Sequence, residues 1–408
     1  MSEGDVLAGA PHPRTREHLF GHAAHEAELM ADWRAGRMPH ALLIGGPEGI
    51  GKATLAYRIA RFVLAVGQAR PDQHDFFVSQ RDPVFRQVAA MSHPDLLVLR
   101  RAAESGEDKI PTVIPAEMVR KVRPFFGSTA ASGGWRVCIV DAVDELNAFG
   151  ANALLKTLEE PPPRALFLLV CHAPGRVLPT IRSRTRIVNL AVPSTQAVAG
   201  FLTSTTNVEP KVAQRAARLA EGHIGIAKLY ATDERVMSDR DELVVGVLNL
   251  ARASDAVLLA GNLIDNAKAQ AEADANRITA GQEAEFRRIN GLAPSDRIPP
   301  KLRGAFNQIA KKDDVKRLVT RRTRDVLDRA LNSIASIYRD VAVLQNNAED
   351  SVGLINLENR SSITELSVRL NRAGAVTRLD EVAHARKRLA GNGNPLLVFE
   401  SLFCALIS

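Results

Sequence analysis

Short apolar runs alternate with amphipathic stretches through the first half of the chain. Five runs are apolar at consecutive positions, as strands covered on both faces are: residues 41–44, 96–99, 136–140, 166–170 and 186–190. Between them, residues 54–66 and 147–159 have the periodicity of amphipathic helices. Repetition of strand, helix and strand predicts a parallel sheet with crossover helices, so this half is predicted to be α/β.

Beyond the fifth run, helical periodicity dominates to the end of the chain. Residues 194–234 are predicted to form a small helical lid, with Glu221-Gly222-His223 as a turn between helices. Residues 235–408 are predicted to form a larger helical domain, in which the Gly- and Pro-rich residues 291–300 are a loop. A chain of 408 residues is long enough for these parts and an α/β domain over residues 1–193.

Composition predicts a cytoplasmic protein. Charged residues make up 24% and hydrophobic residues 46%, which is ordinary for a soluble globular protein. The most apolar window, residues 243–264, contains Asn249, Arg252 and Asp255, which a membrane span would have to bury unpaired. The first residues lack the basic start and apolar stretch of a signal peptide. We therefore expect no membrane association.

Three cysteines lie far apart in the chain, at Cys138, Cys171 and Cys404. No two of them form a CxxC pair, which argues against a disulfide framework and against a four-thiolate zinc site. We therefore expect no metal site.

Positive charge is concentrated in one stretch of the second half. The formal net charge is +7, and residues 286–329 hold 13 Lys and Arg against 5 Asp and Glu, a local balance of +8. Such a stretch could face DNA or a partner, because Lys and Arg release counterions from phosphates. It could also be a solvated helix face, strengthened by pairs such as Asp325 with Arg329. The solvated face is slightly favoured, because aromatic residues do not alternate with the cations as a single-strand stacking surface requires.

The strongest local motif is a glycine-rich turn between the first strand and a helix, Gly46-Pro47-Glu48-Gly49-Ile50-Gly51-Lys52. Glycines allow backbone N–H groups to surround phosphates, and Lys52 would reach the terminal phosphates, so the motif predicts a P-loop. Ala53 stands where a Ser or Thr hydroxyl would bind Mg²⁺. Thr54 follows, but one residue later it points to another side of the helix. Nucleotide binding by this loop remains possible, while metal-assisted chemistry is compromised.

A second element of nucleotide chemistry is the acid that ends a buried strand, Asp141. P-loop enzymes hold the Mg²⁺ shell with such an acid. Hydrolytic members usually place a Glu next, to activate water, but Ala142 occupies that position. Asp144 and Glu145 are displaced in geometry and are not assigned this role. Asp141 could alternatively cap the helix that follows.

Three stretches resemble the bacterial clamp-loader subunits of the AAA+ class. They are Arg37-Met38-Pro39-His40-Ala41, Asn152-Ala153-Leu154-Leu155-Lys156-Thr157-Leu158-Glu159-Glu160-Pro161-Pro162 and Thr180-Ile181-Arg182-Ser183-Arg184. The resemblance runs from about residue 21 to residue 190 and is most specific over residues 147–186. It implies an AAA+ P-loop domain, followed by an all-helical lid and a C-terminal collar domain that joins partner subunits.

Within that family the chain is most similar to the delta-prime branch of DNA polymerase III rather than to the gamma/tau motor branch. Motor subunits carry a hydroxyl after the P-loop lysine, an acid at the position of Ala142 and usually a four-cysteine zinc module. The corresponding segment here, residues 69–93, contains no cysteine, so zinc is not expected. Gly225 stands where motor subunits offer an arginine to the γ-phosphate. The resemblance therefore implies at most that the loop binds ATP or ADP weakly, or binds it without hydrolysing it.

The resemblance also assigns a role to Arg184. In the family, an arginine at this position acts on ATP held by the neighbouring subunit, and Ser183-Arg184-Thr185 matches that motif apart from Thr185. A guanidinium stabilises charge on a transferring phosphoryl group. The structural alternative is an arginine that forms an ion pair at a helix end.

The function implied is that of a delta-prime-like subunit of the replicative clamp loader, which places the sliding clamp on primed DNA. Its partners would be the gamma/tau motor subunits and the delta subunit in a hetero-pentamer. The chain would belong to a DNA-directed DNA polymerase holoenzyme, which is a nucleotidyltransferase. The chain itself is not expected to catalyse a reaction alone. Two alternatives stay open: an active gamma/tau-type ATPase, and a stand-alone DNA-binding AAA+ protein that uses Arg321, Arg322 and Arg324 of the basic stretch.

Overall fold

The computed structural model describes residues 12–65, 75–101, 113–128, 130, 134–309 and 312–407. The chain divides into two compact units between residues 228 and 229. We call the described residues up to 228 unit 1 and those from 229 onward unit 2. The boundary proposed from the sequence between a lid and a collar, at residues 234 and 235, remains a prediction.

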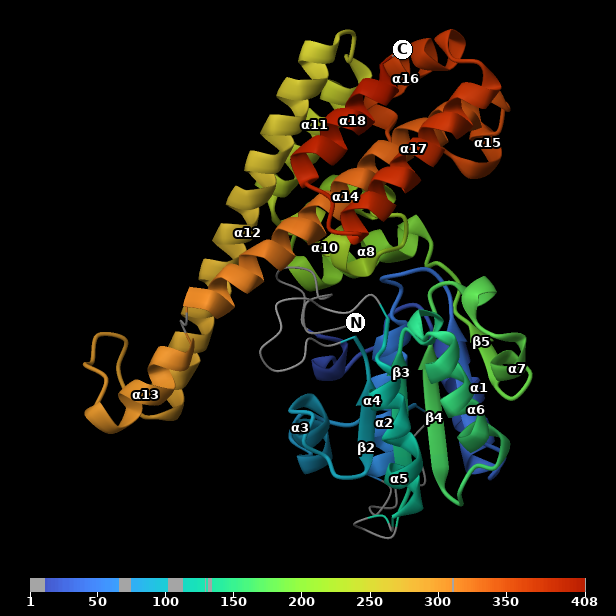
Figure 1. The fold of residues 1–408 in the computed structure, drawn as a ribbon, viewed down its shortest axis with the longest axis vertical. Coiled ribbons are helices and arrows are strands. Elements are labelled where there is room, and N and C mark those ends of the chain that lie inside the picture. Colours follow the sequence, from blue (N-terminus) through green and yellow to red (C-terminus); the bar gives the residue numbers. More distant parts are fainter. Residues whose placement is uncertain are drawn as a thin grey trace. The chain divides into compact units, whose positions relative to one another are not determined.

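Unit 1 is built on a parallel sheet of five strands in the order β2-β3-β4-β1-β5 (Figure 1). The strands are β1 (Ala41–Gly45), β2 (Leu96–Leu99), β3 (Arg136–Asp141), β4 (Ala165–Val170) and β5 (Arg186–Asn189). All five apolar runs are therefore confirmed as strands. The predicted fold class, an α/β P-loop domain with crossover helices followed by helical segments, is also confirmed.

The two faces of the sheet bury separate cores. Leu42 and Ile44 point into one core with α1 (Ala23–Arg34), α2 (Lys52–Leu64) and α3 (Pro83–Ala89). Their neighbours Ala41 and Leu43 point into the other core, where α6 (Ala148–Glu159) packs. Because side chains alternate between the faces of a strand, each run must be apolar throughout. This explains why consecutive apolar residues predicted the strands.

The other helical segments of unit 1 precede the first strand, connect the strands or follow the last strand. They are η1 (Pro13–Thr15), α4 (Ala116–Arg120), α5 (Val122–Gly127), η2 (Val143–Glu145), η3 (Pro174–Arg176), α7 (Pro179–Arg182), α8 (Thr195–Thr206) and α9 (Pro210–Leu219). The helix α10 (Ile224–Thr232) spans the division between the units. Asn147 begins α6 by accepting a hydrogen bond from the backbone N–H of Gly150 at 2.8 Å.

The secondary-structure elements that the structure describes in unit 2 are all helices. Its elements are α11 (Glu234–Leu248), α12 (Ala253–Ile289), α13 (Pro300–Ile309), α14 (Lys312–Gln345), α15 (Glu349–Val352), η4 (Leu357–Asn359), α16 (Arg360–Arg369), α17 (Arg372–Ala390) and α18 (Pro395–Leu406). The predicted loop lies between α12 and α13 and ends where Pro300 begins α13. One apolar core joins α11, α12, α14, α16, α17 and α18.

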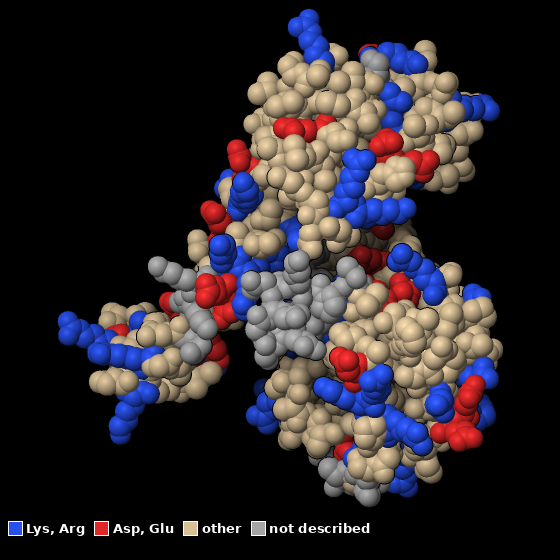
Figure 2. All heavy atoms as spheres, in the orientation of Figure 1, with Lys and Arg blue, Asp and Glu red and all other residues tan. Residues whose placement is uncertain are grey.

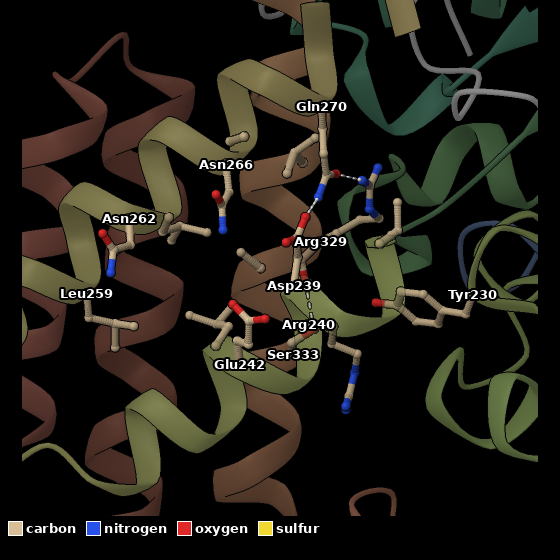
Figure 3. A pocket seen from close by; sticks show the side chains of 16 residues that line it. Tyr230, Asp239, Arg240, Glu242, Leu259, Asn262, Asn266, Gln270, Arg329 and Ser333 are labelled. Carbon is tan, nitrogen blue, oxygen red and sulfur yellow. Dashed lines mark hydrogen bonds between the residues drawn. The ribbon is translucent and has the colours of Figure 1, made fainter. Parts of the chain in front are cut away.

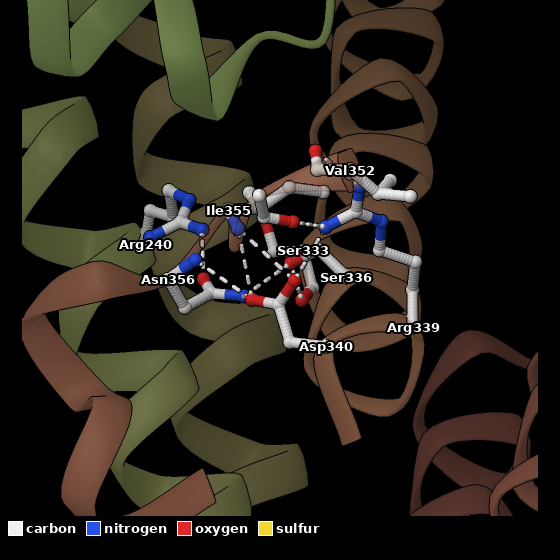
Figure 4. A network of polar contacts seen from close by, with 9 residues as sticks. Arg240, Ser333, Ser336, Arg339, Asp340, Val352, Ile355 and Asn356 are labelled. Carbon is white, nitrogen blue, oxygen red and sulfur yellow. Dashed lines mark hydrogen bonds and ion pairs between the residues drawn. The ribbon is translucent and has the colours of Figure 1, made fainter. Parts of the chain in front are cut away.

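A buried carboxylate anchors the segment between α15 and α16 (Figure 4). Asp340 of α14 is fully buried and accepts hydrogen bonds from the backbone N–H groups of Ile355 at 3.0 Å and Asn356 at 2.8 Å. Arg339 forms an ion pair with it at 2.8 Å. The Asn356 side chain accepts a hydrogen bond from Arg240 at 2.5 Å, so the network also includes α11.

The three cysteines differ in their exposure to solvent. Cys138 and Cys171 are buried and Cys404 is exposed. Burial raises the pKa of the Cys138 thiol well above its usual range and that of Cys171 to about 12. None of the helices in the described part of the chain has the length and apolar character needed to cross a membrane.

Candidate functional site

The glycine-rich turn forms the connection between β1 and α2, as the sequence predicted for a P-loop. Gly46, Gly49 and Gly51 all have positive φ, at 136°, 77° and 107°. These conformations favour glycine, since side chains with a Cβ rarely adopt them. The loop therefore turns sharply enough to open directly into the N-terminus of α2, where backbone N–H groups favour anions.

Lys52 lies folded against its own loop. Its side chain is 3% exposed, and its ammonium donates hydrogen bonds to the carbonyl oxygen of Gly46 at 2.6 Å and to that of Pro47. Burial lowers the pKa of Lys52 to about 8, and nearby Glu48 offsets part of this effect. A phosphate at this loop would have to replace the carbonyl oxygens as the partner of the ammonium.

The segment after α9 packs directly on the loop. A Cβ at Gly49 would lie 2.1 Å from Cδ2 of His223, so the imidazole ring occupies the space beside this glycine. The backbone N–H of Ile224 donates to the Gly49 carbonyl oxygen at 3.3 Å. The predicted turn is confirmed, since Gly222 has a positive φ of 85°. The Glu221-Gly222-His223 turn therefore lies against the P-loop.

The strand-end acid and its neighbours have separate positions. Asp141 is 2% exposed at the end of β3, and Ala142 beside it has a left-handed φ of 72°. Asp144 accepts hydrogen bonds from the backbone N–H groups of His172 and Ala173, both at 3.0 Å. Both carboxylate oxygens of Asp144 thus anchor the segment after β4.

Glu145 is engaged in a different contact. It forms an ion pair with Arg101 at 2.6 Å. Asp144 and Glu145 are thus both engaged in contacts within the fold, and the expectation that neither activates water remains a prediction.

Sequence reasoning missed His172, which lies near the loop. Burial lowers the pKa of His172 to about 4, and the nearby Lys52 ammonium adds to this effect. The imidazole is therefore neutral at pH 7. The signal for it was its position just after β4, because the carboxyl ends of parallel strands meet at one edge of a sheet. A second histidine, His22, contacts the loop through Nε2, 2.7 Å from the Ile50 carbonyl oxygen.

Arg184 lies in the turn between α7 and β5. Its guanidinium forms an ion pair with Glu159 at 2.8 Å and donates hydrogen bonds to the Thr180 carbonyl oxygen at 3.0 Å and to Ser183 Oγ at 3.3 Å. Its side chain is 36% exposed. Within the described residues, Arg184 makes no hydrogen bond or ion pair with the P-loop of its own chain. The structural alternative, an ion pair at a helix end, is thus present in this structure.

The remaining predicted site residues follow Lys52 in the first turn of α2. Ala53 and Thr54 are both 6% exposed. Ala53 offers only a methyl group, so the position after the lysine has no oxygen for a metal ion. Among the described residues, no group of three or more His, Cys, Asp or Glu side chains is placed to hold a metal ion. Residues 69–74 of the segment for which zinc was considered lie outside the described ranges.

A cavity of about 150 Å³ lies in unit 2 between α11, α12 and α14 (Figure 3). At one side of the cavity, the Gln270 amide donates a hydrogen bond to Asp239 and accepts one from Arg329 at 3.2 Å. Burial lowers the pKa of Arg329. We assign the cavity no role in nucleotide chemistry, because its lining residues belong to unit 2 and the P-loop belongs to unit 1.

The cations at the end of the basic stretch are used inside unit 2. Arg322 is 7% exposed and forms an ion pair with Asp325 at 3.4 Å. Arg324 donates to the Asn392 side chain at 2.6 Å. Arg329 is buried against Gln270. These contacts indicate a structural role, but Arg322 and Arg329 are buried and so do not belong to the solvated helix face that the sequence favoured.

Comparisons with known proteins concern mainly unit 1. Residues 21–194 match the family described as DNA polymerase III, delta subunit. DNA polymerase III subunit delta' of Escherichia coli (strain K12) is 35% identical over 49% of this chain and 57% of its own length. That of Yersinia pestis is 33% identical over 57% of this chain and 66% of its own length. The chain thus spans less than two thirds of these relatives.

Two further similarities lie outside the delta-prime proteins. DNA polymerase III subunit gamma/tau of Mycobacterium tuberculosis (strain ATCC 25618 / H37Rv) is 33% identical over 42% of this chain and 28% of its own length. A gamma subunit-related protein of Thermotoga maritima, a solved structure, has 16% identity and a TM-score of 0.39 over 94% of this chain and 98% of its own. That score is too low to support a functional conclusion.

Proposed function

We propose that the chain, which is similar to the delta-prime subunits of DNA polymerase III over residues 21–194, serves as a non-hydrolysing subunit of the clamp loader. In this role it assembles with gamma/tau motor subunits and a delta subunit, and Arg184 acts on ATP held by a neighbour. One combination carries the proposal: Ala53 stands where a hydroxyl would bind Mg²⁺ and Ala142 where a carboxylate would activate water, while Arg184 is present.

The state of the chain's own loop supports the absence of hydrolysis. Lys52 donates to carbonyl oxygens of the loop, and the ring of His223 lies beside Gly49. Phosphoryl transfer requires a metal ion and a positioned nucleophile. Neither Ala53 nor Ala142 can supply an oxygen for these tasks.

The surroundings of Arg184 support a role in trans. Its partner Glu159 is 47% exposed, and an ion pair between exposed side chains contributes only about 0–1 kcal/mol. A phosphate on a neighbouring subunit can therefore replace Glu159 at small cost. The hydrogen bond to the Thr180 carbonyl oxygen would meanwhile keep the guanidinium close to the turn.

The test is the Arg184→Ala variant in the assembled complex with its candidate motor and delta subunits. We expect normal assembly and a loss of DNA-stimulated ATPase of at least about tenfold, since arginine fingers contribute about 10³–10⁵ in rate in other NTPases. Arg182→Ala is the matched control, because Arg182 is an exposed arginine at the end of α7, two residues before Arg184. Equal ATPase in the two variants would contradict the role of Arg184.

A second candidate function is a gamma/tau-type ATPase, favoured by the similarity to gamma/tau relatives. Measuring ATP turnover by the purified chain separates the two. Appreciable turnover that is lost in Lys52→Ala would establish the ATPase and overturn the proposal.

A further inference from the structure

The helices α12 and α14 extend beyond the core of unit 2 (Figure 1). The last buried residue of α12 is Ala275. The next buried residue along the chain is Arg322, in α14. No described residue between these two is buried. We call residues 276–321 the arm. At 1.5 Å per residue, the α12 side alone extends about 20 Å past the last buried residue.

The end of the arm is held by its own contacts. We call residues 285–307, which include the loop and most of α13, the tip. The rings of Phe286 and Phe306 pack edge to face with centroids 5.5 Å apart, and the guanidinium of Arg287 lies 5.4 Å from the Phe306 centroid. Arg287 also donates to the Asp296 carbonyl oxygen at 2.8 Å. The tip is therefore a small structured unit without a buried core.

The exposed charge of the tip is positive. It contains five Lys and Arg and two Asp and Glu. Both acids are engaged locally: Glu285 forms an ion pair with Arg288 at 2.6 Å, and Asp296 accepts from the backbone N–H of Ala293 at 2.7 Å. Figure 2 shows Lys and Arg side chains around the tip.

Three cations of the tip have no such acidic partner. Arg297, Lys301 and Arg303 are exposed, and none of them forms an ion pair with a described residue. Arg303 donates only to the Ile298 carbonyl oxygen, at 3.3 Å, through Nε. Their charges are thus available to a polyanion.

We propose that the tip of the arm binds the phosphate backbone of duplex DNA. Arg and Lys side chains on an element that extends beyond the core of unit 2 can reach phosphates without bringing that core against the duplex. Stacking on single-stranded bases is disfavoured, because Phe286 and Phe306 already pack on each other. Contacts made only to phosphates carry no sequence information, so the binding is independent of sequence.

The experiment measures binding of a short DNA duplex to the full chain over a range of salt concentrations. In the test variant Arg297, Lys301 and Arg303 are all replaced by Gln. If each contacts one phosphate, the slope of log K against log salt falls in magnitude by about 3. Affinity at low salt falls in parallel, uniformly across duplex sequences.

The control variant replaces Lys211, Arg235 and Arg372, three exposed cations outside the arm, by Gln. Its slope should stay close to that of the wild type, and circular dichroism should show both variants folded. Two outcomes overturn the proposal: no duplex binding by the wild type, or equal slopes in the two variants.

Discussion

At the scale of single residues, burial changes the protonation chemistry of Lys52. A lysine normally titrates near 10.5, but desolvation lowers the pKa of this one to about 8. The unfolded chain therefore binds the proton more tightly than the folded chain. Below about pH 8 the charged ammonium destabilises the fold relative to a neutral side chain, and this penalty disappears as the pH rises toward 10.5.

This gives a prediction about pH. The variant Lys52→Met removes the buried charge. Between pH 8 and 10.5, the free energy of unfolding of the wild type should therefore rise relative to that of the variant. Denaturant unfolding of both proteins across this range checks it. NMR of ¹³C-methylated lysines provides an independent measurement, with one signal that titrates near pH 8 and is absent in the variant. A constant difference between the two proteins would contradict the prediction.

Asp340 gives a second prediction at this scale. Removing its carboxylate in Asp340→Ala leaves buried N–H groups of Ile355 and Asn356 without acceptors, so we expect a loss of about 3 kcal/mol in unfolding free energy. The control is Asp328→Ala, because Asp328 is 53% exposed and pairs with Arg386 at 2.9 Å. Its loss should stay within about 1 kcal/mol. Equal losses by urea unfolding would show that the network contributes little.

At the scale of elements, the packing of the Glu221-Gly222-His223 turn on the P-loop can be tested with two glycines. Gly49 and Gly36 both have positive φ, at 77° and 66°, so an alanine at either position costs roughly 1 kcal/mol in backbone strain. Only at Gly49 would the new Cβ also meet a neighbour, the ring of His223. We expect Gly49→Ala to destabilise the protein at least about twice as much as Gly36→Ala.

The rescue experiment identifies the cause. Adding His223→Ala to Gly49→Ala removes the ring and should return stability close to that of Gly36→Ala, measured by thermal unfolding. If the second substitution restores nothing, the clash is not with the imidazole ring.

The elements themselves were largely predictable. The five strands could be found because both faces of the sheet are buried, which makes each run apolar at every position. The P-loop could be found because its residues are contiguous in the chain. The extent of the arm could not, because periodicity indicates a helix but not where its neighbours end.

The contacts of the site depend on residues far apart in sequence. Glu159 meets Arg184, and His223 meets Gly49, only because the fold brings them together. The basic stretch shows the same limit: its sequence does not distinguish the buried Arg322 from the exposed Lys301. Burial therefore decides which cations of the stretch can meet a partner.

At the scale of the whole molecule, separate cores predict separate unfolding. The two cores of unit 1 contain no residue of unit 2, and the core of unit 2 contains none of unit 1. Asp340→Ala should therefore speed amide hydrogen exchange in unit 2 and leave the strands of unit 1 protected, while Gly49→Ala should do the reverse. Exchange followed by mass spectrometry checks both. Uniform acceleration in either variant would indicate one cooperative unit.

The distribution of the cysteines makes the protein suited to site-specific labelling. Thiolates rather than thiols react with maleimides, and the two thiols whose pKa burial raises are held away from solvent in unit 1. A fluorophore added to the native chain should therefore attach at Cys404 on α18 alone. Without any engineered substitution, such a dye could report by energy transfer when a labelled duplex approaches unit 2.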